Sequence, residues 1–284
     1  MTDIDQLLRG SIDLHIHPGP DVISRRLDAM EAAQQARQAG MRAIVIKNHF
    51  YPTAPLAKLV RQLVPGIEVF GSLCLDHEVG GLSPAALKNS AELGAKIVWM
   101  PTFSAANARR SPASTSQTTG LSIVDSSGKL LSEITPILEL VKQYDMVLAT
   151  GHISPAETHV LIKEAVKVGI SKLIITHPLE QGISVEPFAL EDLQRLARMG
   201  AFIELTCLGL LPTSGGNNAS KIVEVIKAIG ARYLIMSTDL GQAYNPTPAE
   251  GMRLFIATLV NKGIASEEID LMVKVNPGKL LGLD

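Results

Sequence analysis

Residues 11–17 carry the sequence SIDLHIH, in which apolar and polar residues alternate and the last two polar positions are His15 and His17. A period of two is typical of a β-strand with one face buried. Seven more short runs rich in Val, Ile and Leu follow, among them AIVIK at 43–47, KIVWM at 96–100 and YLIMST at 233–238. The others lie at 67–75, 146–150, 172–176 and 201–206. We therefore predict eight strands.

Longer stretches with the period of an amphipathic helix lie between the strands. Several have clear ends, as where Ser83 and Pro84 open a helix that Gly94 closes. The predicted helices cover 27–39, 54–63, 84–93, 133–144, 155–168, 190–199, 220–229, 248–261 and 266–274. Strands that alternate with helices pair in parallel through right-handed crossovers. An open doubly wound sheet alternates in the same way, but eight strands favour an α/β fold of the (β/α)8 TIM barrel type, formed by one domain over residues 1–284.

One segment interrupts this alternation. Residues 102–131 are rich in Ser, Thr, Ala and Gly, and LSIVDSSGKLL at 121–131 has the pattern of a small hairpin. A loop of this length in a compact domain is usually functional or disordered. Because it follows a strand, we expect a lid over the active face; a surface excursion or an oligomer contact is the alternative. Arg109 and Arg110 on this lid are candidates to meet an anionic substrate.

The composition limits the class of protein. Apolar residues make up 46% of the 284 residues and the net charge is −2, which supplies a large core and no basic surface for nucleic acid or an anionic membrane. No apolar run approaches the roughly 20 residues that span a bilayer, and the N-terminus lacks a signal-peptide pattern. Cys74 and Cys207 lie in apolar runs, which fits reduced thiols and a cytoplasmic protein.

Polar residues follow four of the predicted strands at their C-terminal ends. His15 and His17 end the first strand, His152 follows the fifth, His177 the sixth and Asp239 the eighth. In a (β/α)8 barrel these ends converge on one mouth, where active sites lie. Each residue alone has an ordinary structural explanation, but the five together at four strand ends predict a metal centre.

The spacing of the first two histidines supports this prediction. Residues i and i+2 of a strand point to the same side, so the imidazoles of His15 and His17 can bind one cation. Imidazole combined with carboxylate is typical of Zn, Mn, Fe or Ni sites and not of Ca or Mg sites. We expect one or two divalent transition metal ions, with zinc as the first choice.

The order HxH on strand one, His on strands five and six and Asp on strand eight resembles the amidohydrolase superfamily of metal-dependent hydrolases. The sequence NPGKLLG at 276–282 also looks like an ending common there. The resemblance implies that His15 and His17 bind the more buried metal ion, and that His152 and His177 bind the second. It also implies that Asp239 binds metal and transfers the proton of the attacking water.

The sequence departs from the superfamily pattern at strand four. Many members with two ions carry a bridging Glu or carbamylated Lys there, whereas this strand ends in Met100-Pro101-Thr102, which cannot bridge. Lys47 after the second strand, if carbamylated, and Glu78 after the third are the candidate substitutes, and His49 is a further candidate contact to metal or substrate. If none of them bridges, the site holds one ion. Glu204 in the seventh strand either points into the barrel or belongs to an internal ion pair.

Metal binding lowers the pKa of water from about 15.7 toward about 7. The expected function is therefore hydrolysis of an amide, cyclic amide, lactone or ester of a small molecule. One alternative is a phosphoesterase of the PHP type, which also begins with HxH but ends with Asp-x-His, where this chain has Asp239-Leu240-Gly241. The other is a metal-dependent decarboxylase or a non-catalytic metal-binding relative, which the missing strand-four ligand favours. A homo-oligomer is left open, since barrels of this kind often form dimers or larger assemblies.

Overall fold

The strands form one parallel sheet that follows chain order from β1 to β8. The computed structural model describes residues 3–110, 119–180, 188–212 and 219–283. The strands of these ranges are β1 (Ile12–Ile16), β2 (Ala43–Ile46), β3 (Glu68–Cys74), β4 (Ala95–Trp99), β5 (Val147–Ala149), β6 (Leu173–Ile175), β7 (Phe202–Thr206) and β8 (Leu234–Ser237). The backbone N–H groups of His17 and Asp239 donate to the carbonyl oxygens of Leu240 and His15 over 2.8 Å each, which joins the last strand end to the first. The predicted (β/α)8 barrel is confirmed.

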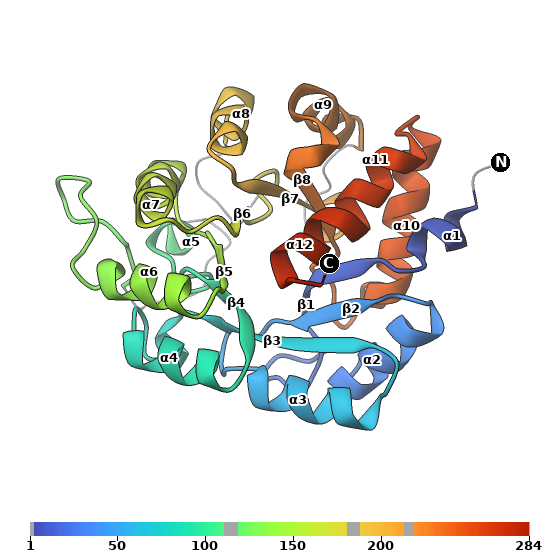
Figure 1. Cartoon of the computed structure of the whole chain (residues 1–284), viewed down its shortest axis with the longest axis horizontal. Helices are drawn as coiled ribbons and strands as arrows, with labels where there is room; N and C mark the ends of the chain where they lie inside the picture. Colours follow the sequence, from blue (N-terminus) through green and yellow to red (C-terminus); the bar gives the residue numbers. More distant parts are fainter. Residues whose placement is uncertain (1–2, 111–118, 181–187, 213–218, 284) are drawn as a thin grey trace.

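Helices surround the strands (Figure 1). They are α1 (Ile4–Leu8), α2 (Ala29–Gln38), α3 (Ala54–Leu63), α4 (Pro84–Glu92), α5 (Ala106–Arg109), α6 (Ile134–Gln143), α7 (Pro155–Val168), α8 (Leu190–Arg198), α9 (Ala219–Ile229), α10 (Pro248–Asn261), α11 (Ser266–Asp270) and α12 (Asn276–Leu281). The single helix predicted at 266–274 is instead α11, a π-helical turn at Leu271–Val275, and α12. Pro277 lacks a backbone N–H group, so a regular ladder cannot run through this stretch. No helix of the described ranges is long and apolar enough to cross a bilayer.

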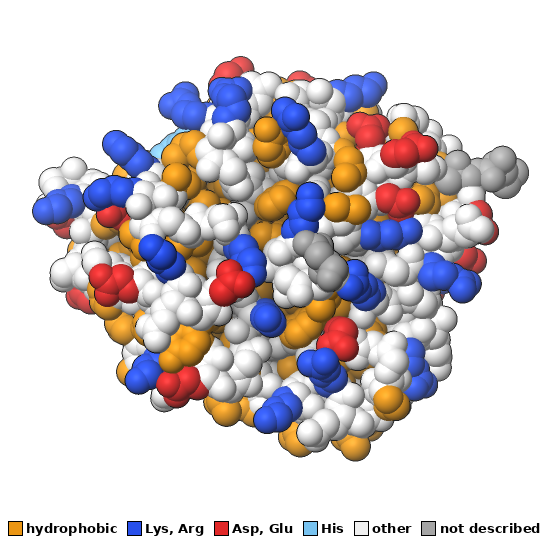
Figure 2. Space-filling model, viewed as in Figure 1, with side chains coloured by type: hydrophobic (Ala, Val, Ile, Leu, Met, Phe, Trp, Pro, Cys, Tyr) orange, Lys and Arg blue, Asp and Glu red, His pale blue; other side chains and the backbone are white. Residues whose placement is uncertain are grey.

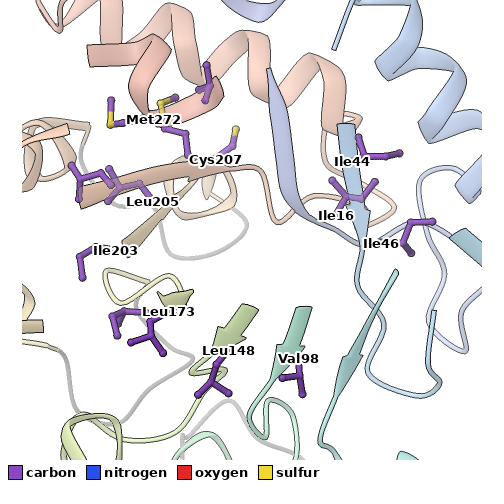
Figure 3. Close-up of a cluster of buried hydrophobic side chains, with 14 of the residues drawn as sticks. Ile16, Ile44, Ile46, Val98, Leu148, Leu173, Ile203, Leu205, Cys207 and Met272 are labelled. Atoms are coloured by element: carbon purple, nitrogen blue, oxygen red, sulfur yellow. The ribbon is translucent and has the colours of Figure 1, made fainter. Parts of the chain in front are cut away.

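The hydrophobic core has two layers. Outward side chains of the strands, such as Ile44, Val98 and Leu148, pack against the helices (Figure 3). Inward side chains of the same strands form a separate cluster inside the barrel, which includes the indole of Trp99. Alternating burial of this kind is what a strand period of two produces when both faces are covered.

Helix α12 closes one end of the barrel. Leu280 and Leu281 belong to the inner cluster, and α12 lies across the strands in the view of Figure 1. On this face, basic and acidic side chains are interspersed and histidine is visible only at one edge (Figure 2). The polar mouth therefore has to lie at the other end, where the strands finish.

A shift in the pairing of β1 with β2 aims the two histidines inward. The register changes between Asp13 and Ile16. Leu14 belongs to the inner cluster, whereas Ile16 belongs to the outer layer (Figure 3). The inward face therefore passes from Leu14 to His15 at this irregularity, and a bulge is a common way to re-aim a side chain beside a functional site.

Gly71 marks the closest approach between a strand and its helix. A Cβ atom there would lie 2.3 Å from Ala54 Cα and 2.4 Å from Ala54 N at the start of α3. Because backbone atoms cannot move aside as a side chain can, we expect Gly71→Ala to lower the free energy of unfolding by at least about 3 kcal/mol. Urea unfolding measures this change.

Gly94→Ala is the comparison for this prediction. Gly94 has a φ of +96° and nothing within 4 Å of an added Cβ, so only the left-handed backbone penalty of about 1–2 kcal/mol applies. Equal losses in the two variants would mean that β3 and α3 separate easily, and would contradict the close packing.

Candidate metal centre

Three side chains from β1 and the loop after β8 converge on one point. His15 Nε2 and His17 Nε2 each lie 3.0 Å from Asp239 Oδ1, and the two nitrogen atoms are 3.2 Å apart. All three residues are buried. The i and i+2 spacing of the histidines thus places both imidazoles on one side, and the three side chains form a group that could hold a metal ion.

A second pair of imidazoles lies on the other side of the same carboxylate. His152 Nε2 is 3.2 Å from His177 Nε2, and His177 Nε2 is 3.9 Å from Asp239 Oδ2. The rings of His15 and His177 are 5.7 Å apart. The structure therefore brings together all five residues that the sequence singled out.

Two of these residues have unusual backbone conformations. Asp239 has a φ of 55° and His177 a φ of 26°, in the left-handed region that residues other than glycine rarely adopt. Gly241 lies so close to β1 that an added Cβ would be 1.8 Å from the carbonyl oxygen of His17. Strain of this kind persists where the surrounding structure fixes it, and it often accompanies a functional site.

Two glutamates complete the cluster, and both are buried. His15 Nδ1 lies 3.2 Å from Glu204 Oε1, so Glu204 points into the barrel and orients the imidazole from behind. Glu180, on the loop after β6, accepts a hydrogen bond from Thr206 Oγ1 and lies with Oε2 3.7 Å from His177 Nδ1. The sequence left two alternatives open for Glu204, and Glu180 was not predicted as a site residue. The only signal for Glu180 in the sequence was its position three residues after His177.

Burial and charge give the imidazoles different proton affinities. Burial lowers the pKa of His177 to about 4, and it holds the pKa values of His17 and His152 well below the usual range. Burial also disfavours the charged form of His15, but the carboxylates of Asp239 and Glu204 outweigh it and raise this pKa to about 9. Three neutral imidazoles thus keep a free lone pair, which is the form that binds metal.

The pKa of Asp239 is held well below its usual range, because His15 and His17 outweigh the effect of burial. An ionised carboxylate among neutral imidazoles is a donor set for a divalent transition metal. His17 Nδ1 has no hydrogen-bond partner among the described residues. The residues present therefore fit the metal ion that the sequence predicted.

Lys47 enters the same cluster from the end of β2. Its side chain is 1% exposed, and Nζ lies 3.0 Å from His15 Nε2 and 5.1 Å from the centre of the Trp99 ring. The sequence named Lys47 as a candidate contact to metal or substrate, and the structure places its amine directly beside a candidate ligand.

His49 forms the wall next to His17, at a ring distance of 5.0 Å. Its Nδ1 is 2.6 Å from Thr102 Oγ1 and 3.2 Å from Asp76 Oδ2, and its ring stacks on Phe103 at 3.7 Å. Asp76 also accepts the backbone N–H groups of Thr102 and Ser104. These contacts fix the imidazole through Nδ1.

The remaining candidate carboxylate lies elsewhere. Glu78 is exposed, and its Oε2 is 3.4 Å from Ser104 Oγ. Among the described residues it is absent from each group that could hold a metal ion. The structure therefore does not bring Glu78 to the histidines, because the loop after β3 turns it to the rim.

The predicted lid is described on both sides of residues 111–118, which lie outside the described residues. Asn107 of α5 donates to the carbonyl oxygen of His152 over 3.1 Å, so the base of this segment rests on the mouth. Val124 and Leu130 pair in an antiparallel bridge, as the hairpin pattern predicted. Arg109 Nε donates to the carbonyl oxygen of Phe103, and Arg110 is exposed.

Solved structures with a similar fold include several enzymes. An amidohydrolase from Pseudomonas aeruginosa has a TM-score of 0.68 and 13% identity, covering 99% of this chain and 98% of the other. A probable dipeptidase from the same organism has a TM-score of 0.69 and 10% identity, covering 98% and 96%. A 2,6-dihydroxybenzoate decarboxylase has a TM-score of 0.59 and 13% identity, covering 97% and 100%. At these identities the likeness defines the class of fold.

The chain belongs to the family described as "Family of unknown function (DUF6282)", whose model matches residues 10–204. This range contains the histidine pairs, Lys47, Glu180 and Glu204, and it ends before Asp239. No curated protein matches the chain.

Proposed function

We propose that this protein is a metal-dependent hydrolase of the amidohydrolase type, acting on an amide, cyclic amide, lactone or ester of a small molecule. One observation carries the proposal: two pairs of imidazoles, each with Nε2 atoms 3.2 Å apart, face the two oxygens of one buried aspartate. Neutral imidazoles gathered around one buried carboxylate are a ligand set that suits a divalent transition metal. The coarse class of the fold supports the same conclusion.

The five candidate ligands have two proposed roles, which are metal binding and proton transfer. His15, His17, His152, His177 and Asp239 would hold one or two divalent ions, with zinc as the first choice. When bound, the metal lowers the pKa of water and polarises the carbonyl group of the substrate. Asp239 accepts the proton of the attacking water and passes it to the leaving group.

Residues at the rim would bind and orient the substrate. Lys47, whose Nζ lies 3.0 Å from His15 Nε2, would stabilise a developing oxyanion. His49 is held from behind and presents Nε2 to the substrate. Arg109 and Arg110 on the lid are the groups for an anionic portion of the substrate. Glu78 contributes only if the rim rearranges on binding.

Decarboxylation is the second candidate function. Strand β4 leads into Met100-Pro101-Thr102, which offers no acidic ligand, and a decarboxylase shares the fold. Phosphoester hydrolysis of the PHP type is less well supported, because the barrel has eight strands and Asp239 is followed by Leu240-Gly241. The free and buried thiols of Cys74 and Cys207 support a cytoplasmic location.

Elemental analysis of the purified protein tests the metal, and a substrate panel tests the reaction. We expect zinc, manganese, iron or nickel in the protein, and turnover of a lactone, cyclic amide, amide or ester. Release of carbon dioxide from a carboxylated aromatic compound would favour the decarboxylase, and turnover of a phosphate monoester the phosphoesterase. Absence of metal after growth with added zinc or manganese would refute the proposal.

A further inference from the structure

Glu180 is a buried carboxylate that the proposed function does not use. The residue is 7% exposed, and one oxygen accepts the hydroxyl of Thr206. The other oxygen, Oε2, has no hydrogen-bond partner among the described residues. A buried polar atom without a partner is costly, and in a native protein it calls for a ligand or another explanation.

Glu180 has no close basic partner among the described residues. No Lys or Arg of these ranges lies within ion-pair distance of it, and the one histidine at that distance is His177, with Nδ1 3.7 Å from Oε2. Glu204 differs, because His15 contacts it directly. Asp239, Glu180 and His177 together form a group whose ligand atoms all lie within 4.8 Å of one another. Two carboxylates this close and out of water cannot both stay ionised without compensation, so either one of them holds a proton or a cation lies between them.

There is a space for such a cation. A cavity of about 20 Å³ is lined by Gly151, His152, Ile153, Thr176, His177, Pro178, Glu180 and Phe188. A space of this size holds one water molecule or one small ion and little more. His152, His177 and Glu180 offer nitrogen or oxygen ligands to this cavity, and Asp239 reaches the same group from the side of His177.

We propose that Glu180 is a ligand of a second divalent cation, which it holds together with His177, His152 and Asp239. This inference rests on the proposed function, and it names the residue that takes the place of the acidic ligand missing after β4. Imidazole and carboxylate ligands select a transition metal such as zinc or cobalt over calcium. The first ion belongs to His15, His17 and Asp239.

An alternative role for Glu180 is to position His177 through Nδ1. The separation of 3.7 Å is longer than a hydrogen bond, so the structure favours direct ligation. The two roles also predict different magnitudes. Loss of a residue behind a ligand typically weakens metal binding 10- to 100-fold, whereas loss of a ligand should weaken it by more.

The experiment counts ions and measures their affinities without any substrate. Metal-free protein is titrated with Zn²⁺ against a chromophoric chelator, and elemental analysis after gel filtration gives the number bound. We expect two ions per chain for the wild type. Glu180→Gln should retain one tight ion and bind the second more than about 100-fold more weakly. Glu191→Gln removes an exposed carboxylate from α8 of the same βα unit, and should bind both ions normally.

Each outcome decides a separate question. One ion in both the wild type and Glu180→Gln would overturn the second site and leave the proposed function standing. Two ions with unchanged affinities in Glu180→Gln would overturn the role of Glu180 alone, and so would a loss confined to 10- to 100-fold. No ion in the wild type would overturn the proposed function as well. If Glu180→Gln does not fold, Thr206→Val, which removes the hydroxyl on the carboxylate, should weaken the second ion and not the first.

Discussion

Replacing Asp239 with asparagine is expected to lower kcat by roughly 10²- to 10⁴-fold, the usual contribution of a general acid–base group. The carboxylate faces both imidazole pairs, and the low pKa of Asp239 keeps it ionised and able to accept a proton. Asparagine has the same shape and cannot accept that proton. The measurement is the rate of turnover on the substrate that the panel identifies, with the far-ultraviolet circular dichroism of both proteins.

Asp145→Asn is the matched control for this variant. Asp145 also has a left-handed backbone, with a φ of 50°, but its side chain is 79% exposed and pairs with Lys172. The same substitution in the same backbone conformation should therefore leave turnover unchanged. Wild-type turnover by the Asp239→Asn protein would remove this carboxylate from proton transfer, whatever its part in binding metal.

The five strand-end residues could be predicted because their positions depend on short-range rules. A period of two places His15 and His17 on the same side of the strand, and parallel pairing brings the ends of all eight strands to one mouth. The same rules predicted the position of Lys47 at the mouth, because it follows β2 directly. Local pattern and barrel geometry were sufficient for these residues, although the register shift within β1 was not visible in the sequence.

The two loop carboxylates show where these rules stop. Glu78 and Glu180 both lie a few residues after a strand, and the only feature of the sequence that distinguishes Glu180 is its position three residues after His177. The structure turns Glu78 to the surface and Glu180 into the cluster, because the path of a loop depends on tertiary contacts and not on a period. The contacts of His49 with Asp76 and Thr102 likewise join loops that are far apart in the chain.

Metal removal is expected to lower the melting temperature by about 8 °C or more. A ligand that binds only the folded state at 1,000 times its Kd stabilises it by about 4 kcal/mol, and each kcal/mol shifts the melting temperature of a chain of this size by about 2–4 °C. The cluster offers binding sites only when residues from four strand ends are assembled, so the unfolded chain has no equivalent site. Differential scanning calorimetry with and without Zn²⁺ measures the shift.

The double variant His15→Ala, His17→Ala tests whether the zinc-dependent rise in melting temperature comes from an ion bound at this cluster. It should lose most of the zinc-dependent shift, because the two imidazoles on Asp239 Oδ1 are gone. His159→Ala removes an imidazole from α7, where His159 pairs with Asp192 at the protein surface, and should keep the full shift. A zinc-dependent rise of equal size in all three proteins would mean that the ion binds elsewhere. The first metal site would then have to be abandoned, even if the barrel and the close packing of its histidines stood.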